Sequence, residues 1–196
     1  LGLFEAPDGI FSVIGNHDTG VYIRDSLSLT PEENTARLIE KEEAIGWRVL
    51  DDRTEYIRRG ADSIAVTGIS FSRALAKERH SSHIPAVGLD EIYASVPDSL
   101  FDITIAHIPQ LWTPILEKRS ADLTLSGHVH AMQMKFPAGE RGVSPARLLY
   151  PRWSGLYEEN GRALYINDGI GCVLYPMRLG ARPEITLITL KRPVQP

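Results

Sequence analysis

The stretch that decides the fold is ADLTLSGHVH, residues 121–130. Its first half alternates apolar and polar side chains, as a β-strand with one buried face does. Its second half places two histidines directly after that strand. Two other stretches have the same form: IFSVI at 10–14 leads into GNHD at 15–18, and FDITIA at 101–106 leads into His107. The pattern predicts three strand ends that deliver polar side chains into neighbouring loops.

Helix and strand signals alternate along the rest of the chain. Thr30 is a typical N-cap followed by Pro31 in the first turn, and Gly46 is a typical helix stop. Further helices are expected near 89–94 and from Leu111 onward with Pro114 in the first turn, and further strands over 61–69, 163–166 and 184–190. Strand–helix units come first and mainly strands follow, which predicts an α/β protein of one domain, 1–196, with a mixed sheet or two sheets in layers.

Composition narrows the class of protein. Hydrophobic residues make up 43% of the 196 residues and charged residues 23%, as in ordinary globular proteins. A net charge of −4 without a lysine or arginine block argues against a nucleic-acid surface. The single cysteine, Cys172, excludes a disulfide within the chain and is predicted to be a buried packing residue. Because the chain starts at Leu1, we expect a longer parent, in which a membrane anchor could precede this part.

The three strand ends carry the side-chain types that bind transition metals. Asn16 offers an amide oxygen, and His107, His128 and His130 offer imidazole nitrogens. Such mixed nitrogen and oxygen donors suit zinc, iron, manganese or cobalt rather than calcium. Four of the six histidines lie on these motifs, which makes an accidental grouping improbable. The sequence therefore predicts a metal site.

The GNHD stretch also predicts a proton-transfer group. A histidine beside a carboxylate, here His17 and Asp18, can be held in one tautomer and carry a proton. Gly15 allows a sharp turn that leaves room for substrate. His80 and His83 stand in a polar stretch without a strand before them, and we interpret them as surface residues.

With these motifs the chain resembles the calcineurin-like metallophosphoesterase superfamily. The resemblance is carried by GNHD, by Ala106-His107 and by GHVH, and it is most specific to the bacterial YkuE/YaeI-type branch in SGHVHAMQ (126–133), GLY (155–157) and NDGIG (167–171). It implies a layered α-β-β-α sandwich with mixed sheets. It also implies hydrolysis of phosphomonoesters or phosphodiesters by a metal-bridging hydroxide.

The resemblance assigns roles residue by residue. It implies two divalent ions, manganese, iron or zinc, with Asn16, His107 and His128 on one ion and His130 on the other. It implies that His17 acts near the leaving group and that Asp18 orients it. Gly15, Asn167 and Gly169 are then expected near the substrate, and the segment 150–175 in the pocket wall. The expected substrate is a phosphorylated small molecule or lipid head group.

One part of the family pattern is not found here. The resemblance implies an Asp-x-His motif and a Gly-Asp motif on strands before GNHD, but only fourteen residues precede Gly15, and Asp8-Gly9 has the order reversed. We therefore expect a sandwich without its first strands, one ion or none, and weak or no catalysis by this polypeptide alone. A homodimer or a separate N-terminal segment is expected to complete it.

Two other functions remain open from the residues. The chain is alternatively a non-catalytic fragment, or a binding or scaffold domain that retains the phosphoesterase fold. A mononuclear metal hydrolase of unrelated type is the third hypothesis. It would need a carboxylate ligand from Asp18, Asp51, Asp52 or Asp168.

Overall fold

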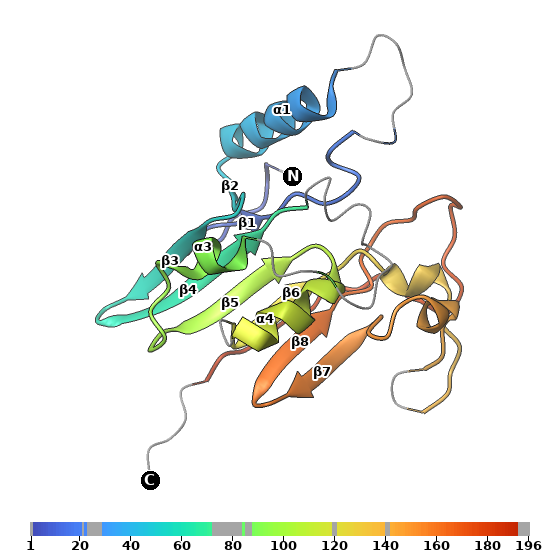
Figure 1. The fold of residues 1–196 in the computed structure, drawn as a ribbon. Coiled ribbons are helices and arrows are strands. Elements are labelled where there is room, and N and C mark those ends of the chain that lie inside the picture. Colours follow the sequence, from blue (N-terminus) through green and yellow to red (C-terminus); the bar gives the residue numbers. More distant parts are fainter. Residues whose placement is uncertain are drawn as a thin grey trace.

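The computed structural model describes residues 2–20, 22, 29–71, 84, 88–118, 121–139 and 142–191. Its centre is a mixed six-stranded sheet accompanied by few helices (Figure 1), which confirms the predicted α/β class. The strands run across the sheet in the order β3 (Thr54–Arg59), β4 (Asp62–Ile69), β5 (Phe101–Ala106), β6 (Leu123–Ser126), β8 (Arg162–Ile166) and β7 (Gly155–Glu159). A separate two-stranded sheet pairs β1 (Phe11–Ser12) with β2 (Arg48–Val49) in parallel.

The central strands of the large sheet are parallel. β4, β5, β6 and β8 all run in one direction, and antiparallel β3 and β7 close the two edges. The β7–β8 hairpin turns at Asn160 and Gly161, whose φ angles of 53° and 75° are those a two-residue hairpin with matching twist requires. Because the central strands are parallel, their carboxyl ends meet at one edge of the sheet.

The helix predicted after Thr30 is α1 (Pro31–Ala44). The Thr30 hydroxyl accepts a hydrogen bond from the Glu33 backbone N–H at 3.2 Å, and the Glu33 carboxylate accepts one from the Thr30 N–H at 2.8 Å. This capping box satisfies two of the N–H groups that a helix start leaves without partners. The predicted N-cap is confirmed.

Two short helices, α3 (Leu89–Tyr93) and α4 (Trp112–Lys118), lie against one face of the sheet (Figure 1). Pro114 stands in the first turn of α4, as predicted. A short 3-10 turn, Pro109–Leu111, precedes α4. The main core packs between these helices and the sheet, and it includes Ile69, Leu89, Tyr93, Ala106, Ile108 and Ile115.

The opposite face of the sheet is only partly covered. Ile103, Ile105 and Leu125 are half-buried there. The strand predicted at 184–190 is wrong, because this segment joins no ladder in the described structure, and Ile185 and Leu187 are 90% and 92% exposed. High β-propensity reflects fit to a paired, half-buried surface, so it cannot form a strand where the backbone finds no partner.

Two smaller expectations can also be compared with the structure. Cys172 is exposed rather than buried, because it lies in the loop that follows β8 and not in a packed element. His80 and His83 lie outside the described residues. Within the part of the chain that the structure describes, no helix is long and apolar enough to cross a membrane.

Candidate metal centre

The carboxyl edge of the parallel sheet brings the motifs together. β5 ends at Ala106 and delivers His107, and β6 ends at Ser126 before Gly127 and His128. Backbone bonds hold the loops in register, because the Gly127 N–H donates to the His107 carbonyl at 3.2 Å and the Asn167 N–H donates to the Ser126 carbonyl at 2.9 Å. The strand ends therefore fix the starting points of these side chains.

Asn16 reaches the same edge from the loop after β1. The Phe71 N–H donates to the Ile14 carbonyl at 3.0 Å, which ties this loop to the end of β4. The Thr19 hydroxyl donates to the Asn16 carbonyl at 2.9 Å. The Asn16 side chain is buried, with 4% exposed, and its Nδ2 donates to the Tyr22 hydroxyl at 3.0 Å. Its Oδ1 is thereby directed to the histidines.

Three side-chain atoms of the predicted ligands form a small triangle. Oδ1 of Asn16 lies 2.6 Å from Nε2 of His107 and 3.1 Å from Nδ1 of His128, and the two nitrogens are 3.1 Å apart. Nitrogen or oxygen atoms bound at right angles to one transition-metal ion, at about 2.1 Å each, lie about 3 Å from one another. The residues present therefore fit one ion that takes one oxygen and two nitrogen ligands.

His130 lines a cavity that Asn16, His107 and His128 also line, and its Nδ1 is buried without a hydrogen-bond partner within the described structure. Burial and the nearby Arg178 charge lower the pKa of His130. Burial, with smaller contributions from His17 and His130, lowers the pKa of His107 to about 4. These two imidazoles are therefore neutral near pH 7, the form whose lone pair can bind a metal.

The backbone after His128 is unusual. His130, Ala131, Met132 and Gln133 have φ angles of 40°, 48°, 47° and 57°. Residues with a Cβ rarely adopt this left-handed region, at a cost of about 1–2 kcal/mol each. The run is held by the Ser144 hydroxyl, which donates to the Ala131 carbonyl at 2.6 Å. Strained backbone of this kind is concentrated at functional sites.

The GNHD loop places its two remaining polar residues differently. The His17 ring is exposed at the cavity, with its centroid 4.7 Å from that of the Tyr22 ring. The Asp18 carboxylate accepts a hydrogen bond from the Gly15 N–H at 2.7 Å, and the Asp18 carbonyl accepts one from the Asn34 amide at 2.6 Å. Asp18 thus closes the turn that carries Asn16 and His17.

Carboxylates do not complete the cluster. Within the described ranges, no three His, Cys, Asp or Glu side chains form a group that could hold a metal ion. The Asp52 carboxylate instead accepts the Ser70 N–H at 2.8 Å, and Asp168 accepts from Ser154 at 3.0 Å and from Lys135 at 3.3 Å. This arrangement gives no support to a mononuclear site built on a carboxylate.

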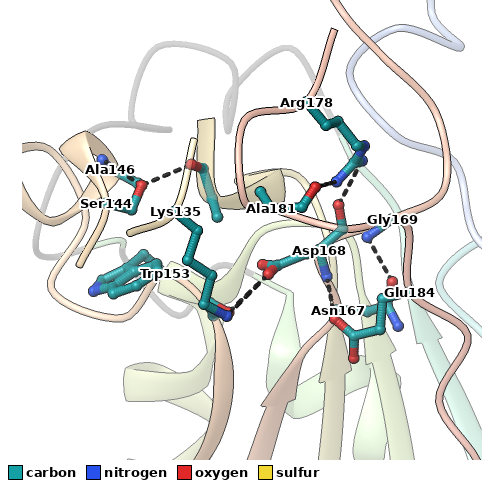
Figure 2. A network of polar contacts seen from close by, with 12 residues as sticks. Lys135, Ser144, Ala146, Trp153, Asn167, Asp168, Gly169, Arg178, Ala181 and Glu184 are labelled. Atoms are coloured by element: carbon teal, nitrogen blue, oxygen red, sulfur yellow. Dashed lines mark hydrogen bonds and ion pairs between the residues drawn. The ribbon is translucent and has the colours of Figure 1, made fainter. Parts of the chain in front are cut away.

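A polar network holds the loop after β8, which carries the cavity-lining residue Arg178 (Figure 2). Asp168 is buried, with 4% exposed, and its backbone carbonyl accepts a hydrogen bond from Arg178 at 2.8 Å. Arg178 also donates to the carbonyls of Gly171 and Ala181, at 2.7 and 3.2 Å. The Arg178 side chain therefore holds the loop after β8 through three of the loop's own carbonyl groups. Lys135 and Arg178 were not predicted, because both stand in stretches of sequence without a motif.

The cavity has a volume of about 650 Å³. Seven of the nine predicted site residues line it: Asn16, His17, His107, His128, His130, Asn167 and Gly169. Gly15 and Asp18 lie in the supporting turn instead. The expected wall from the segment 150–175 is present in part, through Tyr150 and the loop after β8. Most of the predicted residues therefore converge on one cavity.

Comparisons with known proteins add an independent finding. The chain is 27% identical over 202 residues to a Bacillus subtilis protein named as the uncharacterized metallophosphoesterase YkuE, covering 97% of this chain and 59% of that protein. It is 26% identical over 181 residues to the B. subtilis metallophosphoesterase YkoQ, covering 91% and 58%. It is 38% identical over 205 residues to a Bos taurus transmembrane protein with metallophosphoesterase domain, covering 97% and 40%.

The chain thus spans about three fifths of the length of the first two relatives. No protein-family model matches it, and neither does any solved structure.

Proposed function

This chain is a distant homologue of metallophosphoesterases over most of its length, within the calcineurin-like superfamily, and from this premise we propose that its cavity hydrolyses a phosphomonoester or phosphodiester with divalent metal ions. The observation that carries the proposal is the triangle of Asn16, His107 and His128 at the carboxyl edge of the sheet. Ligands gather at this edge in open α/β sheets.

Four residues would hold the metal. In a completed site, Asn16, His107 and His128 would bind one ion, and His130, whose buried Nδ1 faces no hydrogen-bond partner in the described part, would bind a second. When bound, manganese, iron or zinc ions would lower the pKa of water and offset the negative charge of the phosphoryl oxygens. The low pKa of His107 keeps its nitrogen available for this role near neutral pH.

His17 is proposed as the group that gives a proton to the leaving oxygen. Its ring is exposed at the cavity and packs against the Tyr22 ring, so it can reach a substrate without displacing buried groups. Asp18 would act on it through the backbone, because its carboxylate fixes the turn at Gly15. Asn167 and Gly169 would contact the substrate from the opposite loop.

The number of ions is proposed to be one at most in this polypeptide. All the gathered donors are neutral, and attraction for a dication depends strongly on charged ligands. We propose that residues 1–196 form part of an α-β-β-α sandwich and that a second layer, from a homodimer or a separate segment, covers the half-buried sheet face. Catalysis by the chain alone would then be weak.

Two variants test the roles separately. The purified chain is incubated with manganese, and bound metal and hydrolysis of bis(p-nitrophenyl) phosphate are measured together. Asn16→Ala should lose both, while His17→Ala should keep the metal and lose turnover by about 10²-fold or more. Turnover by Asn16→Ala equal to that of the parent chain would contradict the proposal.

Among the residues that the structure describes, no carboxylate joins the histidine group, which favours one alternative, a domain that binds a phosphorylated ligand without hydrolysing it. The same experiment separates the two functions. Binding of phosphate with no hydrolysis, even at the highest metal concentration, would support the binding domain.

A further inference from the structure

Apart from its histidines, the cavity is lined largely by apolar side chains. Met132, Leu149, Tyr150, Val173 and Leu174 line it. The cavity thus has a polar end, where the metal ligands gather, and an apolar side. A ligand that matches both must itself carry a charged end and an apolar arm.

The amide side chains in the cavity lining, Gln133 and Asn167, form hydrogen bonds within the protein. Both ends of the Gln133 amide are engaged, because Nε2 donates to the carbonyls of Tyr175 and Met177 at 3.0 Å, and Oε1 accepts from the Val173 N–H. The Asn167 amide accepts from the Gly169 N–H at 2.7 Å and donates to Thr186 at 2.8 Å. These groups hold the loop and leave hydrophobic side chains to meet a ligand.

The backbone at Leu174, a residue that lines the cavity, is strained. Leu174 stands at the centre of a γ-turn, with φ at 66° and a hydrogen bond of 2.8 Å from the Tyr175 N–H to the Val173 carbonyl. A γ-turn with positive φ is rare and strained for a residue with a Cβ. The leucine side chain is nevertheless 98% exposed. Burial of the leucine side chain in the folded protein therefore does not offset the backbone strain. We infer that contact with a bound ligand does.

The rim continues the apolar surface. Leu149 is half exposed, and its neighbour Leu148 is 83% exposed. The Gln133 and Arg178 bonds both hold the loop after β8, so the Leu174 side chain is presented from a fixed backbone. A preformed apolar wall loses little entropy when it binds a hydrocarbon group.

We propose that this wall binds the apolar arm of an amphiphilic phosphoester, an alkyl or aryl chain attached to the phosphate, with Leu149 and Leu174 at the mouth. This rests on the proposed function for the position of the phosphate. The arm lies along Met132 and Tyr150 and ends against Leu174. Short, fully polar phosphoesters fill only the histidine end.

The test is a chain-length series. Ethyl, butyl, hexyl and octyl phosphate, all below their micellar concentrations, are titrated calorimetrically into the full chain with manganese present. The expected result is a Kd that falls about two- to fourfold for each added methylene until the wall is covered. Equal affinity for ethyl and octyl phosphate, or no binding of octyl phosphate at millimolar concentration, would overturn the proposal.

Matched variants locate the effect. Leu174→Ser and Leu149→Ser should each flatten the dependence on chain length, whereas Leu187→Ser should leave it unchanged, since Leu187 is 92% exposed but lies outside the cavity. If Leu187→Ser has the same effect as Leu174→Ser, the binding is nonspecific and the proposal fails.

Hydrolysis is scored separately. Affinity that depends on chain length, without any turnover, would contradict the proposed hydrolysis but support binding of the apolar arm. Turnover that does not depend on chain length would support hydrolysis and contradict binding of the apolar arm.

Discussion

Gly15 lies directly against the imidazole ring of His107. A Cβ atom on Gly15 would stand 2.8 Å from both Cε1 and Nδ1 of that ring. The ring in turn brings its Nε2 to 2.6 Å from Oδ1 of Asn16. The space beside Gly15 that was predicted for substrate is thus occupied by the His107 ring, and the glycine is needed to let this ring approach Asn16.

Gly15→Ala should therefore weaken metal binding without removing any ligand. The methyl group pushes the His107 ring away from Asn16, and displacing a ligand's support typically costs 10- to 100-fold in affinity. Calorimetric titration with manganese measures it. Gly127→Ala is the matched control, because a Cβ there meets nothing within 4 Å. Equal affinities of the two variants would show that the contact has no role in the site.

The left-handed backbone at Ala131 predicts an unusual response to glycine. Ala131 and Ala146 are both fully buried in one cluster, but only Ala131 has a positive φ, of 48°. Glycine relieves the strain at Ala131, which offsets the lost methyl contacts. Urea unfolding should show Ala146→Gly lowering the free energy of unfolding by about 1–2 kcal/mol and Ala131→Gly changing it by less than about 0.5 kcal/mol. Equal losses would exclude strain at Ala131.

Lys135 neutralises a carboxylate that the fold has buried. Its Nζ lies 3.3 Å from Asp168 and also donates to Ser154 at 2.9 Å (Figure 2). Lys135→Met leaves Asp168 charged and desolvated, and should destabilise the protein by about 3 kcal/mol, measured by urea unfolding. Adding Asp168→Asn should recover much of that loss. If adding Asp168→Asn lowers the free energy of unfolding further, Lys135 does not stabilise the protein by neutralising Asp168.

Asp102 predicts a pH dependence of stability. It is fully buried, accepts hydrogen bonds from Thr67 at 2.8 Å and Thr104 at 2.9 Å, and burial raises its pKa from 3.8 to about 6. Between these values the folded protein binds the proton more readily than the unfolded chain does. The contribution of Asp102 to stability is therefore present at low pH and is lost as the pH rises from about 4 through about 6.

Denaturant unfolding between pH 4 and pH 7 measures this contribution. The free energy of unfolding of the parent chain should change with pH by an amount equivalent to the uptake of up to one proton. Asp102→Asn should remove this pH dependence, while Asp98→Asn, at an exposed position, should keep it. An unchanged slope in Asp102→Asn would place the titration elsewhere.

Periodicity predicted the parts of the fold that local sequence controls. The strands before His107 and His128, and the helix capped by Thr30, follow from side-chain alternation and from turn chemistry, and they were found close to their predicted bounds. The convergence of His107 with His128 follows from parallel strands that end at one edge, whereas Asn16 reaches that edge from the loop after β1, which belongs to the other sheet.

Other features depend on long-range partners that the local pattern does not reveal. Residues 184–190 have strand propensity, but no neighbouring backbone pairs with them in the described structure. The left-handed run is occupied by Ala131 and Met132 rather than by glycines, so the usual sequence signal is missing. The link between Lys135 and Asp168 joins residues 33 positions apart and could be seen only after folding.

The most direct test of the metal centre is the metal content of the purified chain after equilibrium dialysis against manganese or zinc. We expect the parent chain to bind one ion and to lose it in His107→Ala and in His128→Ala, with His17→Ala retaining it. No bound metal in the parent chain, or the same metal content in His107→Ala as in the parent, would contradict this expectation.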